Sequence, residues 1–202
     1  MSADVEVLGS EDIFRGHVVT LRRDTLRLGG GEPTTREIVE HLGAVVVVAL
    51  DADDQVVLVN QYRHPVQARL DELPAGLLDV GNEPALDGAQ RELAEEALLG
   101  AARWHTLLDL FTSPGFTDEA VRVFLARDLN DIARPDGFVV EHEEAAMTVR
   151  RVPLSDAVDM ALAGEITNAA AVAGILAAQV ARAAGWSGLR PADAPWDGWP
   201  RR

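Results

Sequence analysis

The chain has no cysteine among its 202 residues. Disulfide bonds, a thiolate nucleophile and zinc held by cysteine are therefore excluded. Basic residues are also scarce. The chain has 18 lysines and arginines and 33 aspartates and glutamates, which gives a formal net charge of -15. Binding to nucleic acid relies on clustered lysines and arginines, and no such cluster occurs here. We therefore expect no nucleic-acid partner.

Long apolar runs are also missing. The longest, 169–178, is shorter than the roughly 20 residues that cross a bilayer, and Gln179 and Arg182 interrupt its continuation. The first residues, MSADVEVLGSEDIF, are acidic and contain no apolar secretory core. The sequence therefore predicts a protein without a membrane partner, located in the cytoplasm.

Several common catalytic signatures do not occur. Gly29-Gly30-Gly31 is not followed by the Gly-Lys-Ser/Thr of a phosphate-binding loop, so these glycines predict a hairpin turn. No G-x-S-x-G elbow is present. His142-Glu143 begins like a zinc-protease helix, but Ala146 stands where the second histidine is required.

The periodicity of apolar residues predicts a mixed sheet between helices. Residues 14–28 alternate in polarity, 28–33 form a glycine-rich turn, and 35–40 form a strand, which together predict an N-terminal antiparallel ribbon. After the ribbon, strands are expected over residues 43–50, 55–62, 104–111, 120–128 and 147–152.

Two helices are expected after these strands. Ser155 is the predicted N-cap of a short helix that ends at Ala163, and Thr167 of an alanine-rich helix that ends near Ala184. The fold class is therefore α/β, with an α+β mixed sheet. We divide the chain into the ribbon, the catalytic domain and an irregular C-terminal tail, which span residues 1–41, 42–184 and 185–202.

A group of acidic residues lies on a predicted helix that follows a Pro-Ala-Gly turn. At about 100° per residue, Glu92 and Glu96 point the same way and Glu95 lies one ridge over. Carboxylates at this spacing repel unless Arg91 neutralises Glu95, solvent screens them, or a metal ion bridges them. Magnesium prefers oxygen ligands and is usually held by one or two carboxylates together with substrate phosphates. An acidic protein that handles an anionic substrate has a use for such cations.

The order of residues around this helix resembles the Nudix box. Gly76 and Glu83 precede Arg91-Glu92-Leu93-Ala94-Glu95-Glu96, and the step of eight residues from Glu83 to Arg91 fits the family pattern. Two positions depart from it: six residues rather than five separate Gly76 from Glu83, and Leu98 replaces the family's late glycine. Because leucine is disfavoured in the left-handed conformation that ends many helices, we expect Gly100 to end this helix instead, about half a turn later.

Other segments are similar to the ADP-ribose pyrophosphatase branch of the Nudix hydrolases. They are 61–63 (QYR), 72–76 (ELPAG) and 113–119 (SPGFTDE), and Pro114 lies sixteen positions after Leu98, as it does in that branch. The resemblance implies a Nudix-type α/β/α sandwich that hydrolyses the diphosphate of ADP-ribose to AMP and ribose 5-phosphate. Two alternatives stay open: a hydrolase of another nucleoside diphosphate sugar, and a non-catalytic nucleotide-binding module of the same fold.

The resemblance also implies roles for individual residues. The cofactor would be magnesium, or manganese in its place, held by Glu92, Glu96 and the backbone carbonyl of Ala75, with help from Glu95. A glutamate in the polar stretch before residue 147 would act as the general base, either Glu144 or, one position earlier, Glu143.

Further residues are expected to bind the substrate or to support the site. Arg63 would bind phosphate, although an ordinary ion pair at the strand end is the alternative. Glu83 and Arg91 are expected to join the loop to the helix through a salt bridge, next to Gly76. The resemblance further implies a homodimer in which the N-terminal ribbon packs across the partner or exchanges with it, and helps to hold the adenine. Expected substrate-binding residues are Arg63, Glu72, Pro114, Gly115 and Glu119.

Overall fold

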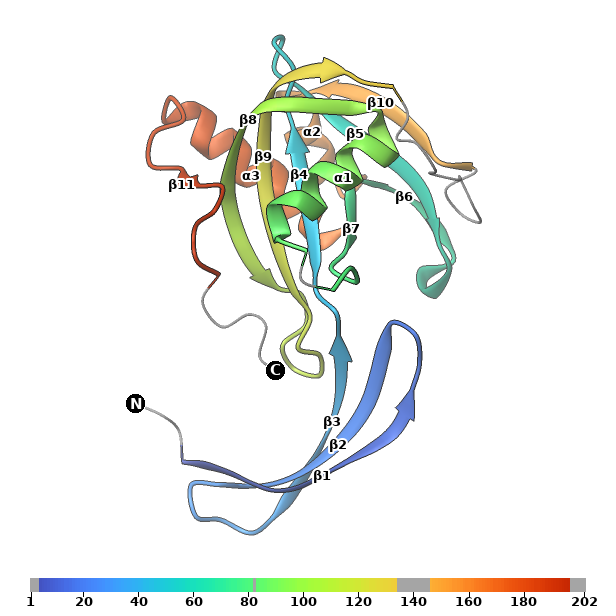
Figure 1. The fold of residues 1–202 in the computed structure, drawn as a ribbon, viewed down its shortest axis with the longest axis vertical. Coiled ribbons are helices and arrows are strands. Elements are labelled where there is room, and N and C mark those ends of the chain that lie inside the picture. The colour runs from blue at the N-terminus through green and yellow to red at the C-terminus, as the bar shows by residue number, and fades with distance from the viewer. Residues whose placement is uncertain (1–3, 82, 134–145, 197–202) are drawn as a thin grey trace. The chain divides into compact units, whose positions relative to one another are not determined.

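The computed structural model of the chain describes residues 4–81, 83–133 and 146–196 (Figure 1). The chain forms two compact units. The first comprises Met1–Gly43 and Phe111–Ala120, and the second comprises Ala44–Leu110 and Val121–Arg202. Each unit is described separately below.

The first unit is built on a three-stranded antiparallel sheet in the order β1-β2-β3. Its strands are β1 (Val5–Arg15), β2 (Val19–Leu28) and β3 (Thr34–His41). The turn between β2 and β3 contains Gly29 and Gly30 at φ of 55° and 75°, a conformation that glycine adopts without steric cost. The predicted antiparallel ribbon is therefore present, and it has an additional first strand in which every residue is exposed.

The second unit contains two sheets. Three strands form one sheet in the order β10-β5-β6, and five form the other in the order β11-β8-β9-β4-β7, in which β4 and β9 run parallel. The bounds of the elements are β4 (Ala44–Ala49), β5 (Gln55–Arg63), a 3-10 turn (His64–Val66), β6 (Ala68–Glu72), β7 (Ala75–Leu77), α1 (Ala85–Ala97), β8 (Leu99–Phe111), β9 (Ala120–Asp131), β10 (Thr148–Pro153), α2 (Leu154–Leu162), α3 (Ala169–Ala183) and β11 (Arg190–Pro191).

Alternation along β4 divides the core between the two faces of the five-stranded sheet. Val45 and Val47 are fully buried with Ala89 and Leu93 of α1, whereas Val46 and Val48 belong to the cluster that includes residues of α2 and α3. Successive side chains of a strand point to opposite faces, so a strand of continuous valines has to be covered on both. The expected α+β sandwich, with a mixed sheet between helices, is confirmed (Figure 1).

The predicted helix ends need three corrections. Helix α1 ends at Ala97, and Leu98 itself adopts the left-handed conformation (φ 55°, ψ 38°), so the expected extension to Gly100 is wrong. The Leu98 N–H bonds to Ala94 O, and β8 begins at Leu99, so strand pairing takes the chain away from the helix. Helix α2 begins after Pro153 rather than Ser155, because β10 runs directly into it.

Helix α3 supplies the third correction. Its N-cap is Asn168, whose side-chain oxygen accepts the Ala171 N–H at 3.0 Å, and not Thr167. Asn is among the strongest N-cap residues, so the local chemistry favours it over the preceding threonine.

Other boundaries also differ from the sequence prediction. β8 begins at Leu99, five residues before the predicted strand, and the tail is not wholly irregular, because Arg190–Pro191 pairs with His105 and Thr106 of β8. No helix in the described part of the chain is long and apolar enough to cross a membrane.

Candidate functional site

Helix α1 carries its acidic residues on the side away from the core. Ala89 and Leu93 are fully buried, while the side chains of Glu92 and Glu95 retain 13% and 18% of their exposure. The space for Glu92 exists because residue 76 is a glycine. A Cβ atom added to Gly76 would lie 1.9 Å from Glu92 Cδ and 2.0 Å from Glu92 Oε1. Gly76 therefore permits the close approach of β7 to this carboxylate.

Arg91 holds three carboxylates at once. Its Nε and Nη2 each donate to Glu83 across 3.1 Å, to Oε1 and Oε2 respectively. Its Nη1 donates to Glu92 at 2.5 Å and to Glu95 at 3.2 Å. The expected ion pair between Glu83 and Arg91 is thus present, and the bidentate geometry fixes the loop to the helix. Pairing of Arg91 with Glu95 at i,i+4, one of the alternatives left open by the sequence, is also present.

Glu92 is poorly neutralised despite this contact. Burial raises its pKa to about 7, even though the nearby Arg91 charge opposes the shift, and Glu95 and Asp79 raise it further. A carboxyl group whose charged form is disfavoured by burial and by neighbouring carboxylates gains from a nearby cation. The environment of Glu92 therefore suits a metal ion.

Glu96 lies one helical turn after Glu92 and reaches the residue before Gly76. Its Oε2 accepts the Ala75 N–H at 2.9 Å, so the Glu96 carboxylate lies beside the backbone of Ala75. Among residues 4–81, 83–133 and 146–196, however, no three acidic or histidine side chains already converge closely enough to hold a metal. The guanidinium of Arg91 instead bonds to Glu83, Glu92 and Glu95.

The oxygen donors of this region fit a hard cation such as magnesium. Glu92, Glu95 and Glu96 supply carboxylates from one helix, and Gly76 leaves room beside them. Arg91 Nη1 donates to Oε1 of Glu92 and to Oε2 of Glu95, and the paired bonds from Arg91 to Glu83 use its other two nitrogens. A cation at Glu92 and Glu95 would bind the second oxygen of each carboxylate or compete with Nη1 for the first.

Arg63 and Glu72 form a second ion pair in the same unit. Arg63 Nε donates to Glu72 Oε1 at 3.0 Å, and Nη2 donates to Oε2 at 2.7 Å. The Glu72 side chain is 3% exposed and that of Arg63 is 43% exposed. The alternative, in which Arg63 is one member of an ion pair at the strand end, is therefore present, and the Arg63 side chain is partly exposed.

The remaining predicted substrate residues belong to the first unit, on the segment 111–120. Glu119 accepts a hydrogen bond from Thr112 Oγ1 at 2.5 Å and lies 3.6 Å from His41 Nδ1. Pro114 and Gly115 are exposed. His41 and Thr112 were not predicted as neighbours of Glu119, and no local pattern connects His41 with a residue so distant in the chain.

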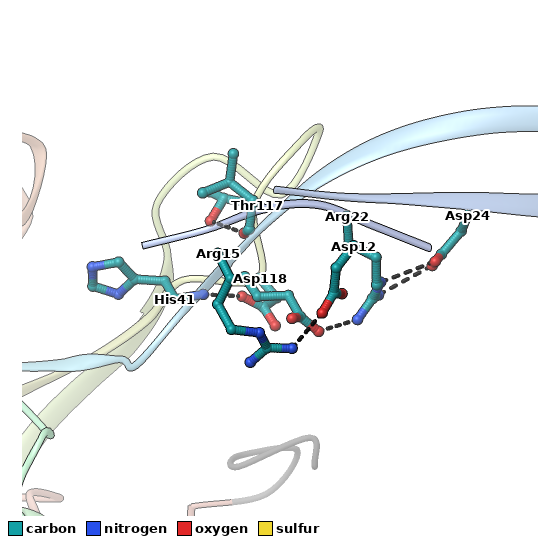
Figure 2. Close-up of polar contacts among 9 residues, drawn as sticks. Asp12, Arg15, Arg22, Asp24, His41, Thr117 and Asp118 are labelled. Atoms are coloured by element: carbon teal, nitrogen blue, oxygen red, sulfur yellow. Dashed lines mark hydrogen bonds and ion pairs between the residues drawn. The ribbon is translucent and has the colours of Figure 1, made fainter. Parts of the chain in front are cut away.

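The end of β3 holds this segment in place through backbone contacts. Figure 2 shows Asp118 beside the backbone of His41, whose N–H donates to Asp118 Oδ1 at 2.8 Å. Thr117 Oγ1 donates to Val39 O at 2.8 Å, and the Val39 N–H donates to Phe116 O at 2.7 Å. The segment therefore has a defined backbone path along β3. The predicted bases Glu143 and Glu144 lie outside the described residues.

The acidic helix, the glycine that accommodates it and the mixed sheet between helices define a class of protein. A family model described as the NUDIX domain matches residues 40–173. The chain belongs to the Nudix family. The resemblance first seen in the sequence is thereby confirmed.

Two relatives and one solved structure are similar to this chain along most of its length. The chain is 48% identical over 193 residues to the ADP-ribose pyrophosphatase of Mycobacterium tuberculosis, across 96% of this chain and 91% of that protein. It is 35% identical to the ADP-ribose pyrophosphatase of Bacillus subtilis, across 83% and 89% of the two chains. A crystal structure of an ADP compounds hydrolase superposes with a TM-score of 0.75 at 23% identity, covering 90% and 96% of the chains, which supports the fold.

Proposed function

We propose that this Nudix hydrolase cleaves the diphosphate of ADP-ribose to AMP and ribose 5-phosphate. The observation that carries the proposal is the 48% identity, along almost the whole chain, to a protein named ADP-ribose pyrophosphatase. The acidic residues Glu92, Glu95 and Glu96 are all present, whereas a non-catalytic module would be expected to lack some of them.

The proposed metal site is formed by Glu92, Glu96 and the carbonyl of Ala75. When bound there, magnesium or manganese would neutralise the diphosphate and lower the pKa of a coordinated water. Glu96 accepts a hydrogen bond from the Ala75 N–H, which would orient it for this role, and the paired bonds of Arg91 to Glu83 would hold the helix while Glu92 and Glu95 bind the cation. The helix thus offers its carboxylates from a fixed backbone.

A general base completes the proposed mechanism. Glu144, or Glu143 in its place, would take the proton of the attacking water, a contribution of about 10² to 10⁴-fold in rate. Glu95 would assist from the helix. Glu144→Gln and Glu143→Gln should therefore lower kcat unequally, and the larger loss identifies the base.

Substrate recognition is proposed for Arg63 and, separately, for the segment 111–120. The exposed part of Arg63, held by Glu72, would donate to a phosphate oxygen, because a guanidinium offers two parallel hydrogen bonds. Pro114, Gly115 and Glu119 would recognise the distal ribose.

We also propose that the chain is a homodimer formed through the N-terminal ribbon. All of β1 is exposed, and Val7 and Phe14 each retain 61% of their surface, so this edge strand needs a cover. Light scattering at micromolar concentration should give the mass of a dimer, and deletion of residues 1–15 should give a monomer. A cytoplasmic location stays a prediction, which cell fractionation tests.

The test of the proposed function is product analysis in heavy-oxygen water. Purified protein with ADP-ribose and magnesium should release AMP and ribose 5-phosphate, and the label shows which phosphorus the water attacks. Glu92→Gln is the matched control and should be at least 100-fold slower. GDP-mannose, assayed in parallel, should be a poorer substrate. Faster turnover of GDP-mannose would move the proposal to another sugar, and tight binding without AMP release would indicate a non-catalytic module.

A further inference from the structure

Glu119 is a half-buried carboxylate in the first unit, and one threonine holds it at two points. The Glu119 side chain is 28% exposed, and Thr112 Oγ1 donates to its Oε2 at 2.5 Å. The Thr112 N–H donates to Glu119 O at 3.3 Å, so the same residue contacts both the side chain and the backbone of Glu119. A glutamate side chain has several rotamers of similar energy, and a fixed donor selects among them.

A second threonine fixes the backbone of Glu119 to β3. Thr117 Oγ1 accepts the Glu119 N–H at 3.1 Å and donates to Val39 O at 2.8 Å. A hydroxyl group has one proton to donate and two lone pairs to accept with, so one hydroxyl can make both bonds. Thr117 and Val39 also form a parallel bridge beside the end of β3 (Figure 2). The backbone of Glu119 is therefore tied to the sheet of its own unit.

His41 is the other polar side chain close to Glu119, but it does not donate to the carboxylate. Its Nδ1 lies 3.6 Å from Glu119 Oε1, and the same nitrogen accepts the Gly43 N–H at 3.1 Å. A ring nitrogen that accepts a hydrogen bond carries no proton, so in the neutral imidazole the proton is on Nε2. Within the described ranges, Thr112 thus supplies the hydrogen bond to this carboxylate, at Oε2, and Oε1 receives none.

We propose that Thr112 and Thr117 orient Glu119 so that its Oε1 accepts hydroxyl groups of the distal sugar, and that they thereby set the affinity for that part of the substrate. A carboxylate only accepts hydrogen bonds, and sugar hydroxyls donate them. The proposal rests on the proposed function, in which Glu119 recognises the distal ribose. Thr112 and Thr117 are positioning residues, because they act through Glu119 and touch no reacting atom.

Hydrogen exchange tests the role of Thr117 without any substrate. Thr117→Val has nearly the shape of threonine but lacks the hydroxyl, whereas Thr117→Ser keeps the hydroxyl and is the matched control. The amide of Glu119 should exchange at least tenfold faster in Thr117→Val, because its acceptor is lost, and at the parental rate in Thr117→Ser. Parental exchange of this amide in Thr117→Val would overturn the role of Thr117.

Kinetics with ADP-ribose and magnesium test the role of Thr112. In Thr112→Val, KM should rise about tenfold while kcat stays within about twofold, since a hydrogen bond to a charged group is lost away from the reacting atoms. Thr112→Ser should keep the parental KM. The inhibition constant of AMP should not change, because AMP has no distal sugar. An equal rise in the AMP inhibition constant would show a general loosening and overturn the proposal.

A double-mutant cycle shows whether Thr112 acts through Glu119. In a Glu119→Ala background, Thr112→Val should change KM by less than about twofold, because the partner of the hydroxyl is already gone. Thr167→Val is a second control, since Thr167 is exposed and lies just before α3. A tenfold rise caused by Thr112→Val in both backgrounds, or by Thr167→Val, would overturn the positioning role.

The two proposals can fail separately. If the parental protein releases no AMP, the proposed function fails, and hydrogen exchange still decides whether Thr117 holds Glu119. If AMP is released and KM is unchanged in Thr112→Val, the proposed function stands and the role of Thr112 is refuted.

Discussion

Replacing Gly76 with alanine should remove the metal site while leaving the fold in place. The new Cβ would lie 1.9 Å from Glu92 Cδ and 2.4 Å from Glu92 Cγ. Carbon atoms come into ordinary contact near 3.5 Å, so the carboxyl group has to retreat by about 1.5 Å. The backbone at Gly76 is not left-handed, so space alone is at issue.

A shift of this size exceeds the roughly 0.5 Å within which a functional site tolerates misplacement. We expect the affinity for Mn²⁺ to fall about 10- to 100-fold, the range seen when a ligand loses its support. The value of kcat/KM for ADP-ribose should fall at least about 100-fold. Because burial already disfavours the charge on Glu92, its outward movement costs little, and Tm should change by no more than about 4 °C.

The measurements are calorimetric titration of Mn²⁺ and the initial rate of AMP release. Gly81→Ala is the matched control, because Gly81 lies in the loop that follows and a Cβ there meets nothing within 4 Å. Parental metal affinity in Gly76→Ala would refute the assignment of Glu92 as a ligand that Gly76 accommodates.

Three further predictions concern the same unit. The pKa of Glu92 is about 7 in the folded protein against an ordinary 4.5, so between these pH values the folded protein binds more protons than the unfolded chain. The free energy of unfolding of the metal-free protein should therefore fall as the pH rises from about 4.5 to 7, while the affinity for Mn²⁺ rises. Glu92→Gln should flatten both pH profiles. A persisting slope in that variant would assign the titration elsewhere. Gly174→Ala places a Cβ 2.9 Å from a side-chain carbon of the buried Leu73. The cost of overpacking, about 1–3 kcal/mol, should exceed the gain in helix propensity of about 1 kcal/mol, so Tm should fall while kcat stays unchanged. An increase in Tm would contradict this prediction. Glu83→Gln removes one ion partner of Arg91 and should lower the free energy of unfolding by about 1 kcal/mol in urea, an estimate that an unchanged midpoint would refute.

The sequence predicted much of the second unit correctly because its signals are local. Continuous valines at 45–48 indicate a strand that is covered on both faces, and the spacing of Glu92, Glu95 and Glu96 places them on one side of a helix. The ends of the helices were harder to predict from the sequence. Leu98 takes a left-handed conformation that its residue type disfavours, because β8 begins immediately afterwards.

Contacts between distant residues could not be predicted. The neighbourhood of Glu119 and His41 depends on how the segment 111–120 runs along β3. The sequence could not show whether Arg91, solvent or a metal ion neutralises the carboxylates of the acidic helix, since this depends on where the Arg91 guanidinium points.

The sequence alone determined the family, the acidic helix and the alternation that builds a sheet between helices, because residue order and period act over a few positions. Only the tertiary structure decided that Gly76 makes room for Glu92, that Glu72 is buried against Arg63, and that residues 190–196 meet Asp109 and Arg122. These contacts join residues far apart in the chain, and burial and close approach exist only once the chain has folded.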